Sequence, residues 1–88
     1  MNPTTALNEI RRYAVQGRIK FSHHGRKRMG ERGATVEDVR YALCEAKVCR
    51  ASPDGPGRWE VPSVDEDGEH LVVVVVIESG VLVVSLFG

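Results

Sequence analysis

Hydrophobic residues change their spacing halfway along the chain, from a helical period to a strand period. In the first half, Ala6, Ile10 and Ala14 recur every four residues, as on the buried face of a helix. In the second half, residues 71–77 form an unbroken apolar run that is typical of a central strand. Helices followed by hairpin-connected strands predict an α+β domain whose N-terminal helices pack on a C-terminal antiparallel sheet.

Capping signals predict three helices. Each one starts at a side chain that can accept a hydrogen bond from the first helical turn: Asn2, Ser22 and Thr35. The expected spans are residues 3–16, 22–32 and 35–46. The second helix is unusual, because Met29 is its only large apolar residue. Gly25 and Gly30 each cost it up to about 1 kcal/mol relative to alanine.

Residues 47–87 are predicted to form the sheet. Clusters of Pro, Gly and Asp mark its turns, at residues 53–57, 65–68 and 79–80. Pro62 interrupts one strand and favours an edge or a bend there. Residues 18–21 also read as a short extended segment.

The length and composition predict one domain over residues 1–88. The longest apolar run has seven residues, far too few for a membrane span. Only two cysteines occur, Cys44 and Cys49, which favours a reducing cytoplasm. Neither cysteine combines with His23 and His24 in a metal-ligand spacing, so we predict no metal and no cofactor.

The net charge of zero hides a strong asymmetry between the two ends of the chain. Residues 1–32 carry eight bases and two acids, whereas residues 33–88 carry four bases and ten acids. Such asymmetry is typical of a protein with an anionic partner, although the two halves can also neutralise each other.

The second predicted helix carries the strongest functional signal. His24, Arg28 and Arg32 are spaced by four residues, so a helix places all three along one side. Arginine forks can bind phosphate oxygens, and a histidine can transfer protons near neutral pH. A solvated helix side, or pairing with acids of the second half, explains the same pattern about equally well.

These residues resemble the signature of a family of small bacterial proteins, a domain of unknown function. The family pattern His-Ala-x-x-Arg-Met-x-x-Arg-Gly, followed by a helix with an acidic start, is similar to residues 24–39. The strand at residues 81–87 is also similar, so the resemblance covers roughly residues 18–87. Gly25 stands where alanine is usual, which loosens the helix.

The family looks like a distant branch of the RelE-like toxins, in particular the MqsR-like ones. This resemblance implies a RelE-like fold and a metal-independent mRNA endoribonuclease of a type II toxin–antitoxin system. It also implies a protein antitoxin, which in such systems often binds zinc. The toxins usually take catalytic residues from the sheet and the C-terminal tail. Here the sheet offers Arg50, Arg58, Glu60, His70 and Ser85, and no basic or tyrosine-bearing tail follows Phe87.

Cleavage of RNA without metal needs a base, a cationic group and an acid. We predict His24, Arg28, Arg32 and His70 as catalytic residues, although a surface histidine beside a turn is the commoner role for His70. We predict Arg26, Lys27, Arg50 and Arg58 as RNA-binding residues. Two alternatives remain: a non-catalytic nucleic-acid-binding module and a protein-interaction module, both using the basic second helix.

The valines of residues 72–76 point to both faces of their strand. The second helix is too polar to cover one of these faces. We therefore expect an exposed apolar patch that a homodimer partner or an antitoxin segment covers.

Overall fold

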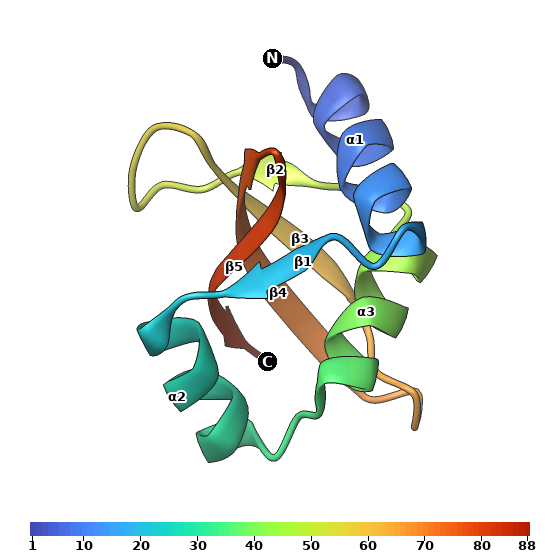
Figure 1. Ribbon diagram of the computed structural model, residues 1–88, viewed down its shortest axis with the longest axis vertical. Helices are drawn as coiled ribbons and strands as arrows, with labels where there is room; N and C mark the ends of the chain where they lie inside the picture. The colour runs from blue at the N-terminus through green and yellow to red at the C-terminus, as the bar shows by residue number, and fades with distance from the viewer.

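Three helices and five strands follow one another in the computed structural model, which describes residues 1–88 (Figure 1). The helices are α1 (Pro3–Val15), α2 (His23–Arg32) and α3 (Val36–Glu45). The strands are β1 (Ile19–Phe21), β2 (Arg50–Ala51), β3 (Arg58–Val64), β4 (His70–Glu78) and β5 (Gly80–Phe87). The predicted α+β fold, with helices in the first half and hairpin strands in the second, is confirmed.

The sheet has the strand order β1-β5-β4-β3-β2 and is mixed. Strands β2 to β5 pair antiparallel as predicted, but β1 lies parallel to β5 at the edge. The antiparallel prediction for residues 47–87 is therefore confirmed, and the structure adds β1 to the sheet. The sequence could not place this strand, because three residues carry no pattern that identifies a distant partner. The predicted sheet region begins at residue 47, but its first strand covers only Arg50–Ala51. This strand follows Cys49, whose thiol donates to the carbonyl of Pro3.

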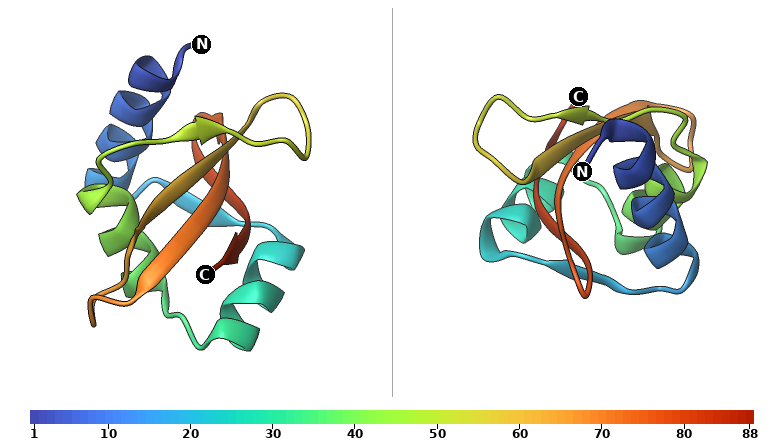
Figure 2. Two further views of the ribbon diagram at one scale, coloured as in Figure 1. Left: turned by 180° about the vertical axis from the view of Figure 1, so that it is seen from behind. Right: turned by 90° about the horizontal axis from the view of Figure 1, so that it is seen from above.

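Helices α1 and α3 cover one face of the sheet and enclose the core (Figure 2). Helix α1 contributes the stripe predicted from the sequence, Ala6, Ile10 and Ala14, and α3 contributes Val39, Ala42 and Leu43. The sheet contributes the residues that alternate toward this face: Val61, Leu71, Val73, Val75, Val81, Val83 and Leu86. None of the helices is long and apolar enough to cross a lipid bilayer.

Side chains at the helix ends fix the two core helices. Asn2 accepts a hydrogen bond from the backbone N–H of Thr5, as its capping role predicts. At the start of α3, Thr35 and Asp38 form a reciprocal capping box. Arg40 of α3 then donates to the last carbonyls of α1, those of Ala14 and Val15, so the two helices hold each other in place.

Helix α2 lies on the other side of the sheet from α1 and α3, along the part of β5 that β1 leaves unpaired (Figure 2). The backbone N–H of Ser22 donates to the carbonyl of Val83 at 2.9 Å. A Cβ built on Gly25 would overlap that same carbonyl oxygen, so the helix backbone lies close to β5 there, and Met29 reaches the core cluster. The helix therefore protects a sheet edge, and the missing side chain of Gly25 lets it approach β5 closely.

The expected patch of exposed valines is absent from the middle of β4. Val72 and Val74 are only 2% and 3% exposed, although no helix packs on β3 or β4 from their side. Cross-strand neighbours shield them: Pro62 and Phe87 flank Val72 in register. The prediction of a valine patch open to a partner is wrong here, because larger cross-strand neighbours, Phe87 beside Val72 and Glu60 beside Val74, flank the small valines on a twisted sheet.

Candidate nucleic-acid interface

The face of the sheet opposite α1 and α3, called the open face below, carries two rows of residues that cross four strands. The first row consists of Arg58, Val76, Leu82 and Lys20, on β3, β4, β5 and β1 in that order. Both ends of this row are exposed cations, and neither makes an ion pair within the chain. At the spacing of paired strands, they lie about 15 Å apart across a partly exposed apolar floor.

The second row lies next to the first and consists of Arg50, Glu60, Val74 and Ser85. Its outer pair is a salt bridge, with the Nε of Arg50 2.8 Å from an oxygen of Glu60. The glutamate side chain is 10% exposed, whereas that of the arginine is 56% exposed. The guanidinium of Arg50 therefore faces solvent, and it covers the carboxylate of Glu60 beneath it.

Arg28 of α2 lies at the margin of the open face, where β5 ends. Its Nε donates to the carbonyl of Leu86 at 3.2 Å, and its Nη1 lies 3.8 Å from a carboxylate oxygen of Glu31. This contact satisfies a carbonyl on the unpaired edge of β5. The Nη2 atom takes no partner within the chain, so Arg28 can still bind an anion.

Arg32, the third member of the predicted catalytic row, has a structural position. Its Nη2 lies 3.2 Å from an oxygen of Asp65 and donates to the backbone carbonyl of His70 at 3.0 Å. For Arg32, the structure thus has the ion pair with an acid of the second half that the sequence allows as an alternative to anion binding. Arg32 thereby fixes the end of α2 to the β3–β4 turn.

Asp65 organises that turn. Its other carboxylate oxygen accepts hydrogen bonds from the backbone N–H groups of Asp67 and Glu69, each at 2.9 Å. The hydrogen bond from the N–H of Glu69, together with the guanidinium of Arg32, lowers the pKa of the Asp65 carboxyl below its ordinary value. The ionised form is therefore the one that the fold stabilises.

Asp65→Asn is expected to lower the melting temperature at pH 7 by about 5 °C or more, since it removes the charge that Arg32 and two N–H groups stabilise. Because the folded-state pKa is lowered, this stabilisation is present above the ordinary carboxyl pKa near 3.8 and is lost as the pH falls below it. Thermal unfolding followed from pH 7 to pH 3 should show the two proteins converging. Asp67→Asn is the control, and an undiminished difference at pH 3 contradicts this account.

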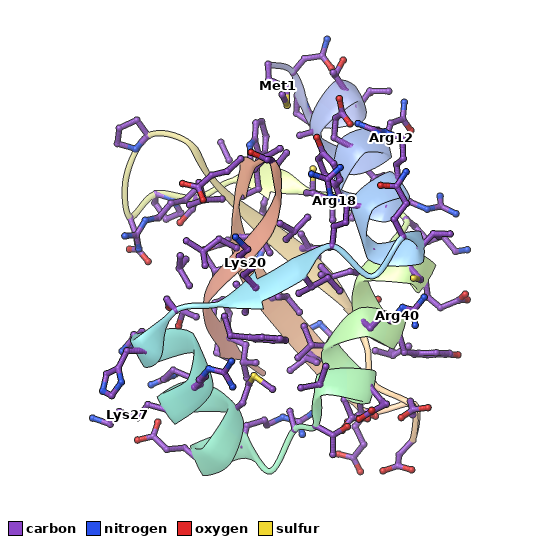
Figure 3. The ribbon with its side chains drawn as sticks, in the orientation of Figure 1. Met1, Arg12, Arg18, Lys20, Lys27 and Arg40 are labelled. Carbon is purple, nitrogen blue, oxygen red and sulfur yellow. The ribbon has the colours of Figure 1, made fainter.

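The other predicted residues of α2 are exposed and stand apart from the two rows. His24 and Lys27 take no side-chain partner, and the guanidinium of Arg26 lies over the ring of Phe21 at 5.5 Å. Figure 3 shows Lys27 pointing outward from α2. A shallow pocket of about 230 Å³ separates this helix from the end of β5 and is lined by Arg28, Glu31, Arg32, Leu86, Phe87 and Gly88.

The structure thus assembles the predicted sheet residues better than the predicted helix row. Arg50 and Arg58 share the open face, and Arg32 is tied to the turn. The imidazole of His70 is exposed at the start of β4. Sequence reasoning missed Lys20, because its place beside Leu82 depends on a parallel pairing between segments about 60 residues apart.

No three His, Cys, Asp or Glu side chains gather as a metal site would require. Cys49 is buried, and burial raises the pKa of its thiol, so it is a packed residue with little thiolate at neutral pH.

One comparison with known proteins gives a match. A family model described as a domain of unknown function (DUF4258) matches residues 21–85. No curated protein and no solved structure matches the chain. The matched residues contain α2, α3 and nearly all of the sheet, and they leave out α1.

Proposed function

The chain belongs to the family described as a domain of unknown function (DUF4258), and we propose that it binds RNA across the open face of its sheet. The row of Arg58, Val76, Leu82 and Lys20 supports this proposal most directly. Unpaired cations at both ends suit a phosphate backbone, and the apolar floor between them suits unstacked bases.

The margins of the open face carry further groups that favour an anionic strand. Arg28 on α2 has a free Nη2, and Arg50 on β2 has an exposed guanidinium. Both groups lie at the open face. Phe87, which is 39% exposed, adds an aromatic ring that can stack on a base. The two carboxylates beside these cations each already have a cationic partner, Glu60 with Arg50 and Glu31 with Arg28.

A stricter form of the proposal is a metal-independent endoribonuclease of the RelE-like toxin class. In this form Glu60 takes the proton of the attacking 2′-hydroxyl, since it is a covered carboxylate held by Arg50. Arg50 or Arg28 stabilises the charge of the phosphorane. Neither imidazole lies beside Glu60 in the free chain, so His24 or His70 protonates the leaving oxygen only after a movement of α2 or of the β3–β4 turn. A protein antitoxin, acidic where it meets the basic α2, completes this form of the proposal.

Binding is tested with a labelled single-stranded RNA and the purified chain. If about three phosphates are neutralised, the logarithm of the association constant should fall against the logarithm of salt with a slope near −2. We expect the fluorescence anisotropy of the RNA to rise on binding whatever its sequence, and the affinities measured in this way to follow this slope. No binding at low salt with tens of micromolar protein contradicts the proposal.

Cleavage is tested on the same samples by gel electrophoresis. His24→Ala and Arg28→Ala are each expected to reduce cleavage about 100-fold or more, as for the loss of an acid–base group or a charge stabiliser. His23→Ala, which changes the exposed neighbour of His24, is the matched control. Circular dichroism must show all three variants folded. Wild-type rates in the folded His24 and Arg28 variants remove α2 from the cleavage site, whereas binding without any product supports the non-catalytic form.

A further inference from the structure

A pocket of about 420 Å³ lies between the start of β1 and the β4–β5 hairpin. Its polar lining includes Arg18, Lys20 and Glu78, and Leu82 forms part of its apolar lining. The volume falls within the range of small-molecule sites. The pocket lies away from α2, the helix on which the sequence signature is centred.

Short backbone contacts hold the two sides of this pocket together. The N–H of Val81 donates to the carbonyl of Arg18 at 2.9 Å, and a Cβ on Gly80 would come within 2.9 Å of that same oxygen. Gly80 also has a φ of +137°, so both its conformation and the space around it require glycine. The pocket is therefore a fixed feature of the hairpin and of β1.

The two cations of the pocket are available to a ligand. Arg18 comes directly before β1 and Lys20 lies within it, two residues further on, so extended backbone points their side chains to the same side. Figure 3 shows both residues beside the β4–β5 hairpin. The Nη2 of Arg18 donates to the carbonyl of Ser79 at 2.8 Å, and its guanidinium lies over the ring of Tyr13 at 5.1 Å. These contacts orient the guanidinium, but no carboxylate neutralises either cation within ion-pair distance.

The pocket continues the open face, because Lys20 and Leu82 belong to both. A strand lying along the row from Arg58 to Lys20 arrives at the mouth of the pocket. We infer that the pocket holds the terminal phosphate of an RNA strand whose first nucleotides lie on the open face; this inference rests on the proposed function. A phosphate suits it better than a base does, because two cations line it and no aromatic ring does.

Glu78 allows a test in which a substitution strengthens phosphate binding, which a purely structural role would not produce. Its carboxylate lines the same pocket as Arg18 and Lys20 and takes no hydrogen-bond or ion-pair partner. It therefore repels a phosphate held there, and removing its charge should strengthen binding of a phosphorylated end.

The test compares one short single-stranded RNA with a 5′-phosphate, a 3′-phosphate or hydroxyls at both ends. One phosphorylated form should bind the wild-type chain about tenfold more tightly than the hydroxyl form. Arg18→Gln should abolish this preference, and Glu78→Gln should increase it. Glu69→Gln, which changes an exposed glutamate at the opposite end of β4, is the matched control.

Different results would exclude the phosphate pocket and the RNA-binding open face. RNA binding with equal affinity for all three ends, unchanged in Arg18→Gln and Glu78→Gln, overturns the pocket assignment and leaves the open face intact. If no RNA binds, the open-face proposal falls, and adenosine monophosphate then tests the pocket alone. Shifts of the Gly80 and Leu82 amide signals on its addition support a phosphate pocket, and unchanged amide signals overturn it.

Discussion

Gly25→Ala is expected to destabilise the protein by about 2 kcal/mol, although alanine is the better helix former. A Cβ at this position would overlap the backbone carbonyl oxygen of Val83 and would lie 3.2 Å from the Oγ of Ser22. A backbone carbonyl cannot turn aside as a flexible side chain can, so α2 must move away from β5. That movement strains the hydrogen bonds from Ser22 to Val83 and from Arg28 to Leu86.

Gly30→Ala in the same helix is the matched control. A Cβ there meets no atom within 4 Å, so only the helix propensity changes, and stability should rise by about 0.5–1 kcal/mol. Urea unfolding of the three proteins measures both effects. Two substitutions of the same kind, five residues apart, should thus have opposite signs. Equal or stabilising effects at both positions would show that α2 does not pack on β5 this closely.

The double variant Lys20→Glu/Arg58→Glu is expected to weaken RNA binding about 100-fold at 0.1 M salt. Both side chains are exposed and unpaired, so the fold should tolerate the change, while the open face loses both ends of its cationic row. Fluorescence anisotropy with a labelled single-stranded RNA measures the affinity. The logarithm of the association constant should also fall less steeply with the logarithm of the salt concentration, because fewer counterions are released.

The control reverses the same amount of charge away from the open face. Arg11→Glu/Lys47→Glu changes two exposed cations, one on α1 and one two residues after the end of α3. An account based on net charge alone predicts the same loss of affinity in both double variants. A loss confined to the variant of Lys20 and Arg58 locates the binding surface, and equal losses contradict it.

Local patterns in the sequence were sufficient to predict the helices and hairpins. Asn2, Thr35 and the four-residue spacing of Ala6, Ile10 and Ala14 act within one or two helical turns, so they can be read from the chain alone. The alternation of β3 and the glycine turn before β5 are equally local. These features predicted the layer arrangement that the structure has.

Relations between distant segments could not be predicted in the same way. The parallel pairing of Lys20 with Leu82, the cover over Val72 and the tie from Arg32 to Asp65 each join residues far apart in the chain. The row of His24, Arg28 and Arg32 on α2 was visible in the sequence, but its chemistry was not. Partners supplied by β5 and by the β3–β4 turn decide which of these arginines stay free.

The most direct test of RNA binding at the open face is a methyl spectrum of valine- and leucine-labelled protein with and without a short single-stranded RNA. Neighbouring residues of one strand point to opposite faces, so β4 and β5 carry their own internal controls. RNA bound at the open face should shift the methyl signals of Val76 and Leu82 and leave those of Val73 and Val75 unchanged. Shifts confined to residues of α1 and α3, or no shift at millimolar RNA, would contradict it.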